Sequence, residues 1–202
     1  AADRRQWRGV LAVLAAVAVV TTLIAAGVIT FDPTLVARWT AVAIVGVTVG
    51  YFSYLLAFAG LDRTERRRVL VVLALFVSSA LFWAGYEQAG SSLNLFAERF
   101  TDRMVGGFEI PAGWFQAPSS LYILLFAPAF SALWIHLGRR NLDPAAPAKF
   151  ALGLLLLGLG FVVMVGAATV VASGRLAGPQ WLLLAYLLHC FGELCLSPVG
   201  LS

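Results

Sequence analysis

The segment Lys149–Ala172, KFALGLLLLGLGFVVMVGAATVVA, runs for 24 residues and carries no ionisable side chain after Lys149. An α-helix rises about 1.5 Å per residue, so about 20 apolar residues cross the hydrocarbon layer of a bilayer. The segment is therefore predicted to be a transmembrane helix. Its glycine-rich run, Gly153–Gly160, follows no strand, so we interpret it as a helix-packing feature and not as a nucleotide-binding loop.

Five further segments have a similar length and apolar content, and each is predicted to span the membrane. They are Gly9–Thr30, Trp39–Gly60, Val69–Ala97, Ser119–Leu137 and Trp181–Ser202. Composition agrees with this reading, because 61% of the 202 residues are hydrophobic and only 12% are charged, against about a quarter in soluble domains. The predicted fold class is an all-α integral membrane protein with six transmembrane helices.

The basic residues lie between the apolar runs and are not gathered on one folded face, which argues against a nucleic-acid partner. Of the 14 basic residues, ten lie in connectors on one side of the predicted membrane and four on the other. The positive-inside rule then predicts that the amino-terminal end and the connectors around Arg66 and Arg139 are cytoplasmic. Cys190 and Cys195 suggest neither a disulfide framework nor a metal site. The sequence has no enzyme or cofactor motif, so we expect neither.

Two acidic residues, Glu87 and Glu193, lie within the predicted spans. An ionised carboxylate at that depth costs a few kcal/mol, so such a residue normally faces the bundle interior and is paired, hydrated or protonated. A functional role is the default interpretation of an intramembrane carboxylate. The alternative is a neutral glutamate that holds two helices together through hydrogen bonds.

Both glutamates belong to polar and aromatic rows at helical spacing, which are predicted to line a watered cavity. The first row is Phe76, Ser79, Trp83, Glu87, Ser91 and Asn94, and the second is Tyr186, His189, Glu193 and Ser197. His189 is interpreted as a hydrogen-bonded packing residue, with a proton relay as the alternative. Pro128 and Pro198 remove backbone hydrogen bonds within their spans, which predicts kinks that act either as gates or as inert geometry.

The stretch FWAGYEQAGSS (Phe82–Ser92) resembles the seventh transmembrane helix of bacterial proton-dependent oligopeptide transporters, which are members of the major facilitator superfamily. WFQ at 114–116, followed by a span with Pro128, is similar to their eighth helix. PAKFALG at 147–153 resembles the entry to the ninth, and GELCLSPVG at 192–200 resembles the tenth. The first two spans resemble the helical pair that bacterial members insert between two six-helix halves.

This resemblance implies a domain organisation and an incomplete chain. Residues 1–68 are expected to form the inserted hairpin, and residues 69–202 the first four helices of the carboxyl-terminal half. The chain begins without methionine and stops within an apolar run. We therefore expect it to be a piece of a longer protein, whose amino-terminal helical half is its structural partner.

The resemblance also implies roles for single residues. Glu87 is expected to take part in proton coupling, and Glu193 to bind the amino terminus of a peptide. The remaining substrate-binding residues are expected to be Trp83, Phe76, Ser197, Ser119 and Tyr186, and the gating residues Pro128 and Pro198. Ser119 stands where relatives often carry asparagine. Its polar group is shorter, so the hydrogen bond that asparagine is expected to form with the peptide backbone does not carry over directly.

The function expected from these features is proton-coupled symport of di- and tripeptides across the bacterial inner membrane by alternating access. The bilayer, the peptide and protons would be its partners, with the proton as coupling ion and no other cofactor. One alternative is a transporter of the same fold for another small solute such as nitrate, although Glu193 would repel an anion. Another is a helical membrane scaffold or receptor that transports nothing.

Overall fold

The computed structural model describes residues 32–200, with side chains as far as Leu196, and a few positions before Asp32 (7, 10, 11, 14, 15, 17–19, 21–23, 26 and 27). The chain divides into two compact units, Ala1–Arg63 and Thr64–Ser202. Only these scattered positions of the predicted span Gly9–Thr30 are described, so the span as a whole stays a prediction.

The first unit contains helix α2 (Pro33–Phe58), which contains the second predicted span up to Phe58. Asp32 caps its amino terminus, where the carboxylate accepts hydrogen bonds from the hydroxyl of Thr34 at 2.7 Å and from the backbone N–H of Thr34 at 2.9 Å. Hydrogen bonds from the Thr34 side chain and from the first helical N–H groups lower the pKa of Asp32. No residue of α2 is buried, so its apolar surface is available to lipid or to other helices.

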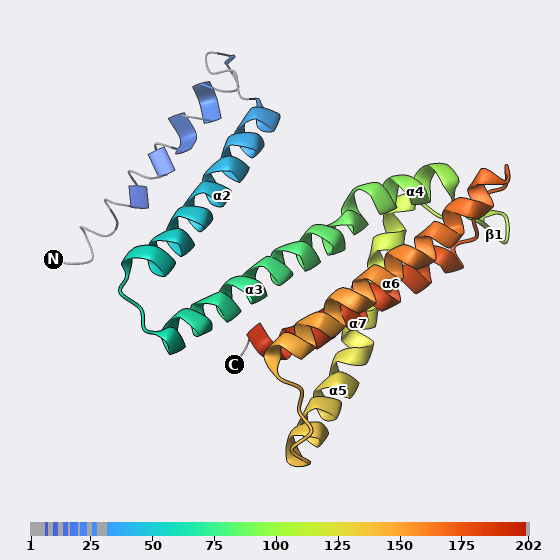
Figure 1. Ribbon diagram of the computed structural model, residues 1–202. Coiled ribbons are helices and arrows are strands. Elements are labelled where there is room, and N and C mark those ends of the chain that lie inside the picture. Colours follow the sequence, from blue (N-terminus) through green and yellow to red (C-terminus); the bar gives the residue numbers. More distant parts are fainter. Residues whose placement is uncertain are drawn as a thin grey trace. The chain divides into compact units, whose positions relative to one another are not determined.

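The second unit is helical apart from one short hairpin (Figure 1). Its elements are α3 (Arg63–Tyr86), the 3₁₀ turn η1 (Glu87–Gly90), α4 (Ser92–Phe100), strands β1 (Met104–Val105) and β2 (Phe108–Glu109), the 3₁₀ turn η2 (Ala112–Gln116), α5 (Ala117–Arg139), α6 (Ala146–Ala172) and α7 (Gln180–Gly200).

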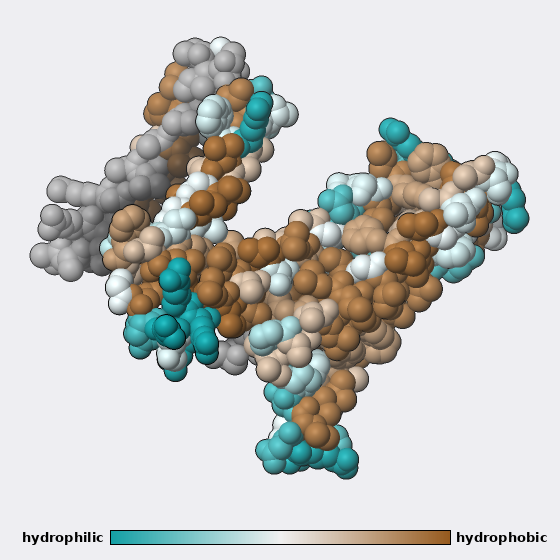
Figure 2. Space-filling model, viewed as in Figure 1, coloured by the Kyte–Doolittle hydropathy of each residue, from teal (hydrophilic) through white to brown (hydrophobic). Residues whose placement is uncertain are grey.

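Among the described residues, four helical stretches are long and apolar enough to cross a membrane, and they correspond to the second to fifth predicted spans. They are Pro33–Phe58, Arg63–Phe100, Ala112–Arg139 and Ala146–Ala172. The sixth predicted span corresponds to α7, a helix of 21 residues. Figure 2 shows why these helices suit lipid, because apolar side chains cover their flanks and hydrophilic side chains gather near helix ends.

Helices α6 and α7 pack side by side along their length and form the centre of the second unit (Figure 1). Glycines permit the close approach: a Cβ atom added to Gly192 would lie 2.8 Å from the carbonyl oxygen of Gly153. Gly160 lies equally tightly against His189 and the backbone of Ala185. The interpretation of Gly153–Gly160 as a helix-packing feature is confirmed for its two end glycines, whereas Gly158 contacts nothing within 4 Å.

The connectors at one end of these helices are tied together. Thr101 and Ala177 form a parallel β-bridge, in which the N–H of Asp102 donates to Ala177 O at 2.8 Å and the N–H of Ala177 donates to Phe100 O at 2.9 Å. The hairpin turns through Gly106 and Gly107, whose positive φ angles favour glycine. The bridge holds the carboxyl-terminal end of α4 near the connector between α6 and α7.

Candidate functional site

The predicted span around Glu87 is interrupted at that residue. Helix α3 ends at Tyr86, Glu87 begins η1, and the chain becomes helical again at Ser92. Gln88 bridges the interruption: its Nε2 donates to Ala84 O at 3.1 Å, and its Oε1 accepts from the hydroxyl of Ser92 at 2.7 Å. The sequence Gly90-Ser91-Ser92 explains the change, because glycine and serine are poor residues for a helix interior.

This interruption corrects the predicted row of polar residues. Phe76, Ser79 and Trp83 share a face of α3, with Glu87 directly after it, but Ser91 and Asn94 lie beyond the 3₁₀ turn and do not continue the row. The prediction from helical spacing assumes one regular helix from Phe76 to Asn94. The 3₁₀ turn at Glu87–Gly90 breaks that helix.

The carboxyl-terminal end of α3 packs against α6 and α7 through the face opposite this row. Phe82 is fully buried and clusters with Leu157 and Leu196. Gly85 lies directly against the side chain of Leu157. Trp83 and Phe76 are 43% and 45% exposed, and Glu87 is exposed as well. Phe76, Trp83 and Glu87 therefore lie on the exposed side of this segment.

Glu193 lies on α7 close to the end of α3 and is half-buried. The end of α3 contacts α7 at this point, since a Cβ atom added to Gly192 would lie 3.0 Å from the Phe82 ring, and the Tyr86 side chain lies beside the Glu193 carboxylate. No described residue donates a hydrogen bond to Oε2 of Glu193, although that atom is buried. An acceptor oxygen at membrane depth without a donor is suited to a cationic or hydrogen-bonding ligand.

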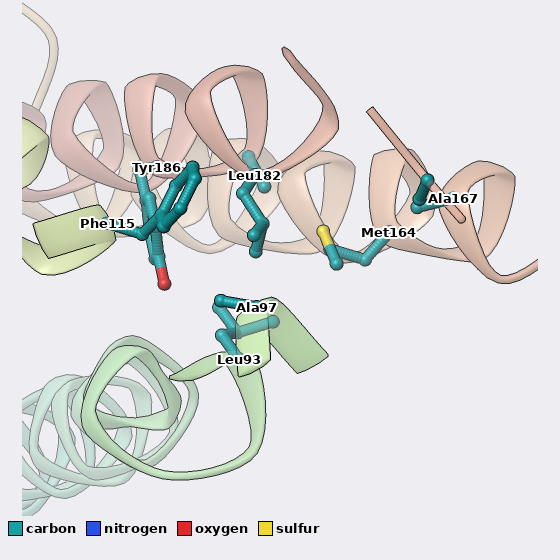
Figure 3. Close-up of a cluster of buried hydrophobic side chains, with 9 residues drawn as sticks. Leu93, Ala97, Phe115, Met164, Ala167, Leu182 and Tyr186 are labelled. Carbon is teal, nitrogen blue, oxygen red and sulfur yellow. The ribbon is translucent and has the colours of Figure 1, made fainter. Parts of the chain in front are cut away.

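Two more predicted residues of α7 lie in the packed interior. Tyr186 is 1% exposed and belongs to a hydrophobic cluster with Leu93, Phe115 and Leu182. Figure 3 shows its ring beside Phe115 and its hydroxyl directed towards the helix that carries Leu93. Tyr186 and Glu193 are seven residues apart, which is about two helical turns. His189 is 2% exposed and packs against Gly160 and the ring of Phe161, as the packing interpretation predicts. Neither of its ring nitrogens has a hydrogen-bond partner among the described residues, so the predicted hydrogen bonding is not found.

The remaining predicted site residues lie on α5 and at the end of α7. Ser119 is half-buried in the first turn of α5, and Pro128 is exposed in the middle of that helix, which continues without interruption. Ser197 and Pro198 belong to α7, but their side chains lie outside the described part of the chain. The structure thus brings Glu193, Glu87 and Trp83 together around Tyr86, and it separates them from Tyr186.

An apolar cavity of about 340 Å³ lies at the other end of the unit, between the hairpin and the first turns of α5 and α7. It is lined by Val105, Ile110, Trp114, Phe115, Pro118, Pro179 and Leu183. None of the predicted site residues lines it. The cavity is therefore separate from the candidate site.

Two sets of polar residues at the helix contacts were not predicted from the sequence. Tyr86 precedes Glu87 directly, and its position beside an intramembrane carboxylate was an available signal. The second set lies at the α5–α6 connector, where Lys149 is 8% exposed, forms an ion pair with Asp143 at 2.9 Å and lies 4.7 Å from the ring centre of Trp134. A single lysine at the entry to an apolar span was the signal there.

Comparison with known proteins identifies the family. The model of the POT family matches residues 34–202. The chain belongs to the POT family. A POT structure described as a peptide transporter in complex with sulfate superposes with a TM-score of 0.76 and 35% identity, covering 100% of this chain and 40% of that one. The predicted fold class, an all-α integral membrane protein of the major facilitator type, is thereby confirmed.

Curated POT relatives agree. The peptide transporter YePEPT of Yersinia enterocolitica is 46% identical over 197 residues, which is 96% of this chain and 39% of the relative. Dipeptide and tripeptide permease B of Edwardsiella piscicida is 35% identical over 159 residues, which is 78% of this chain and 32% of the relative. The chain thus spans about two fifths or less of the length of these relatives, which are transporters and not enzymes.

Proposed function

We propose that the complete protein carries out proton-coupled symport of di- and tripeptides across the bacterial inner membrane by alternating access. The two named relatives are a peptide transporter and a dipeptide and tripeptide permease, which supports peptides as the cargo. In this proposal, residues 1–68 form a hairpin inserted between two halves, and residues 69–202 contribute four helices to the second half. The first half completes the substrate cavity, with the amino-terminal end of this chain in the cytoplasm.

The observation that carries the proposal is the carboxylate of Glu193. It is half-buried on α7 beside the end of α3, and its Oε2 accepts no hydrogen bond from the described residues. The ammonium group at the amino terminus of a peptide supplies both the charge and the donors that this oxygen lacks. Because every di- or tripeptide has that terminus, recognition there accommodates many side chains.

The exposed residues of α3 complete the proposed site. Trp83 and Phe76 provide aromatic surface for peptide side chains, and Ser119 and Ser197 contribute polar groups, whereas the buried Tyr186 supports the packing of α7. Glu87 alternates between an ion pair with the other half of the protein and a protonated, released state. A membrane potential of about 100 mV contributes roughly 2.3 kcal/mol per proton and one pH unit about 1.4 kcal/mol. Together they support roughly 500-fold accumulation per proton.

Two other functions make different predictions. A nitrate carrier of the same fold would place an anion near Glu193, and the negative charge of Glu193 would repel that anion. A scaffold or receptor would show no proton-driven uptake of labelled dipeptide when the complete protein is reconstituted in liposomes. Uptake that requires an inward proton gradient therefore distinguishes the transporter from the scaffold.

A double-mutant cycle tests the role of Glu193. Peptide binding to the complete protein is measured for the native form and for Glu193→Ala, each with dialanine and with N-acetyl-dialanine. Loss of one partner of a buried charge pair costs about 2 to 5 kcal/mol, so Glu193→Ala should weaken dialanine binding at least about 30-fold. The acetylated peptide should bind the native protein poorly and lose little more in the variant. If the two losses simply add, Glu193 does not bind the peptide terminus.

A further inference from the structure

Tyr86 lies between the two intramembrane glutamates. It is the last residue of α3, directly before Glu87, and it is half-buried against the rest of the unit. Its ring stacks on Phe82 with a centroid distance of 5.7 Å and meets the edge of Trp83 at 5.4 Å. Since Phe82 is itself fully buried, these contacts hold the tyrosine ring against the packed end of α3.

This end of α3 packs against α7 directly beside Glu193, because a Cβ atom added to Gly192 would lie 3.0 Å from the Phe82 ring. Tyr86, one turn after Phe82, is thereby placed to donate its hydroxyl hydrogen to the Glu193 carboxylate. A phenol donates one hydrogen bond, which stabilises the ionised form of a carboxylate and fixes its direction. The buried Oε2 of Glu193 accepts no hydrogen bond from the described residues. One donor on the carboxylate therefore still leaves Oε2 without a hydrogen-bond partner.

We propose that Tyr86 is a positioning residue for substrate, whose hydroxyl holds the Glu193 carboxylate so that its remaining oxygen meets the peptide ammonium. This inference rests on the proposed function of Glu193. The packing of α3 requires only an aromatic ring, which phenylalanine at position 86 would supply equally well. The hydroxyl is explained by its partner on α7.

Tyr186, the other tyrosine near this face of α7, does not fill the same role. It is buried among Leu93, Phe115 and Leu182, about two helical turns from Glu193. Tyr86 approaches Glu193 from another helix instead, so a shift of α3 against α7 changes the orientation of the carboxylate. The position of Tyr86 next to Glu87 places both glutamates at the same junction between α3 and η1.

The test compares Tyr86→Phe, Glu193→Gln and the double variant in the complete protein, with dialanine and N-acetyl-dialanine as ligands. Tyr86→Phe should weaken dialanine binding about 10-fold, the effect of one hydrogen bond to a charged group. It should change N-acetyl-dialanine binding less than about 2-fold and cause no further loss in the Glu193→Gln background. Tyr122→Phe, which removes a half-buried hydroxyl from α5, is the matched control and should bind both peptides normally.

Three results would overturn the inference. They are equal losses for both peptides, a loss in Tyr86→Phe that persists with Glu193→Gln, and unchanged dialanine binding by Tyr86→Phe. If Glu193→Gln lowers dialanine binding but Tyr86→Phe does not, only the role of Tyr86 is wrong. If Glu193→Gln leaves dialanine binding intact, the proposed function of Glu193 is wrong as well.

A second pair of variants covers the case in which Tyr86→Phe does not fold. Tyr86→Gln keeps a donor without the ring, and Tyr86→Leu keeps neither. Discrimination between dialanine and its acetylated form should be stronger in Tyr86→Gln than in Tyr86→Leu. Equal discrimination in the two variants would contradict a hydrogen-bonding role for Tyr86.

Discussion

Glu87 and Glu193 differ in their surroundings, although both lie in apolar segments. Glu193 is half-buried beside Tyr86, whereas Glu87 is exposed at the start of a 3₁₀ turn. A carboxylate on a packed helix can be held in one geometry for a ligand. A carboxylate at a helix break is freer to change partners, which suits a group that gains and loses a proton.

Glu87→Gln in the complete protein should spare peptide exchange and abolish proton-driven accumulation. Glutamine keeps the shape of glutamate and can still form hydrogen bonds, but it does not titrate. Counterflow of labelled dipeptide and uptake driven by a pH gradient measure the two activities separately in liposomes. Undiminished uphill uptake by this variant would reassign Glu87 to packing.

A hydrogen bond joins helices α5 and α7, and Pro198 explains why its acceptor is free. Pro198 has no N–H, so the carbonyl oxygen of Leu194 lacks its helical donor. The indole Nε1 of Trp134 donates to that oxygen at 3.3 Å. Lys149 lies over the face of the same indole and is paired with Asp143. The consequence of the proline is thus an interhelical contact, whereas its gating role stays a prediction.

Trp134→Phe should lower the free energy of unfolding in detergent by about 1 to 3 kcal/mol, because it leaves the Leu194 carbonyl without a donor. The loss should shrink in a Pro198→Ala background, where residue 198 regains an N–H that bonds to Leu194. Trp114→Phe removes an indole from a side chain that is 63% exposed and should have little effect. A loss of the same size with and without Pro198→Ala would exclude this hydrogen bond as the cause.

Gly192→Ala should destabilise the protein by about 1 to 3 kcal/mol, because its new Cβ would lie 2.8 Å from Gly153 O and 3.0 Å from the Phe82 ring. Gly158→Ala is the matched control on α6, where nothing lies within 4 Å of the added carbon. It should be neutral or slightly stabilising, since alanine favours a helix. Equal unfolding midpoints for the two variants would contradict the close approach of α6 and α7.

The charges of the whole chain predict its orientation in the membrane. Arg66→Cys and Arg140→Cys should resist an impermeant maleimide in intact cells, whereas Arg175→Cys should react. These three positions are exposed, and the native Cys190 and Cys195 are buried, which keeps background labelling low. Lys149 is unsuitable for this experiment because it is buried in its ion pair. Reaction at Arg66→Cys from outside would reverse the topology.

Much of the architecture follows from sequence because the bilayer imposes it. Backbone groups in hydrocarbon must be hydrogen-bonded within the segment, so an apolar run such as Lys149–Ala172 forms a helix whatever its neighbours are. Helix α6 accordingly contains the whole of that predicted span. The same reasoning identified Glu87 and Glu193, since an acidic residue in such a run is conspicuous without any structure.

Contacts between helices were decided only by tertiary structure. Helical spacing predicts that Ser91 and Asn94 continue the polar row that contains Glu87. The 3₁₀ turn instead separates these two residues from the row. The approach of Tyr86 to Glu193, and of Trp134 to the carbonyl of Leu194, joins residues that are 107 and 60 positions apart. Such pairs depend on the angle at which two helices cross and on where glycines allow close approach. The hydrophobic periodicity of a single helix predicts neither of these.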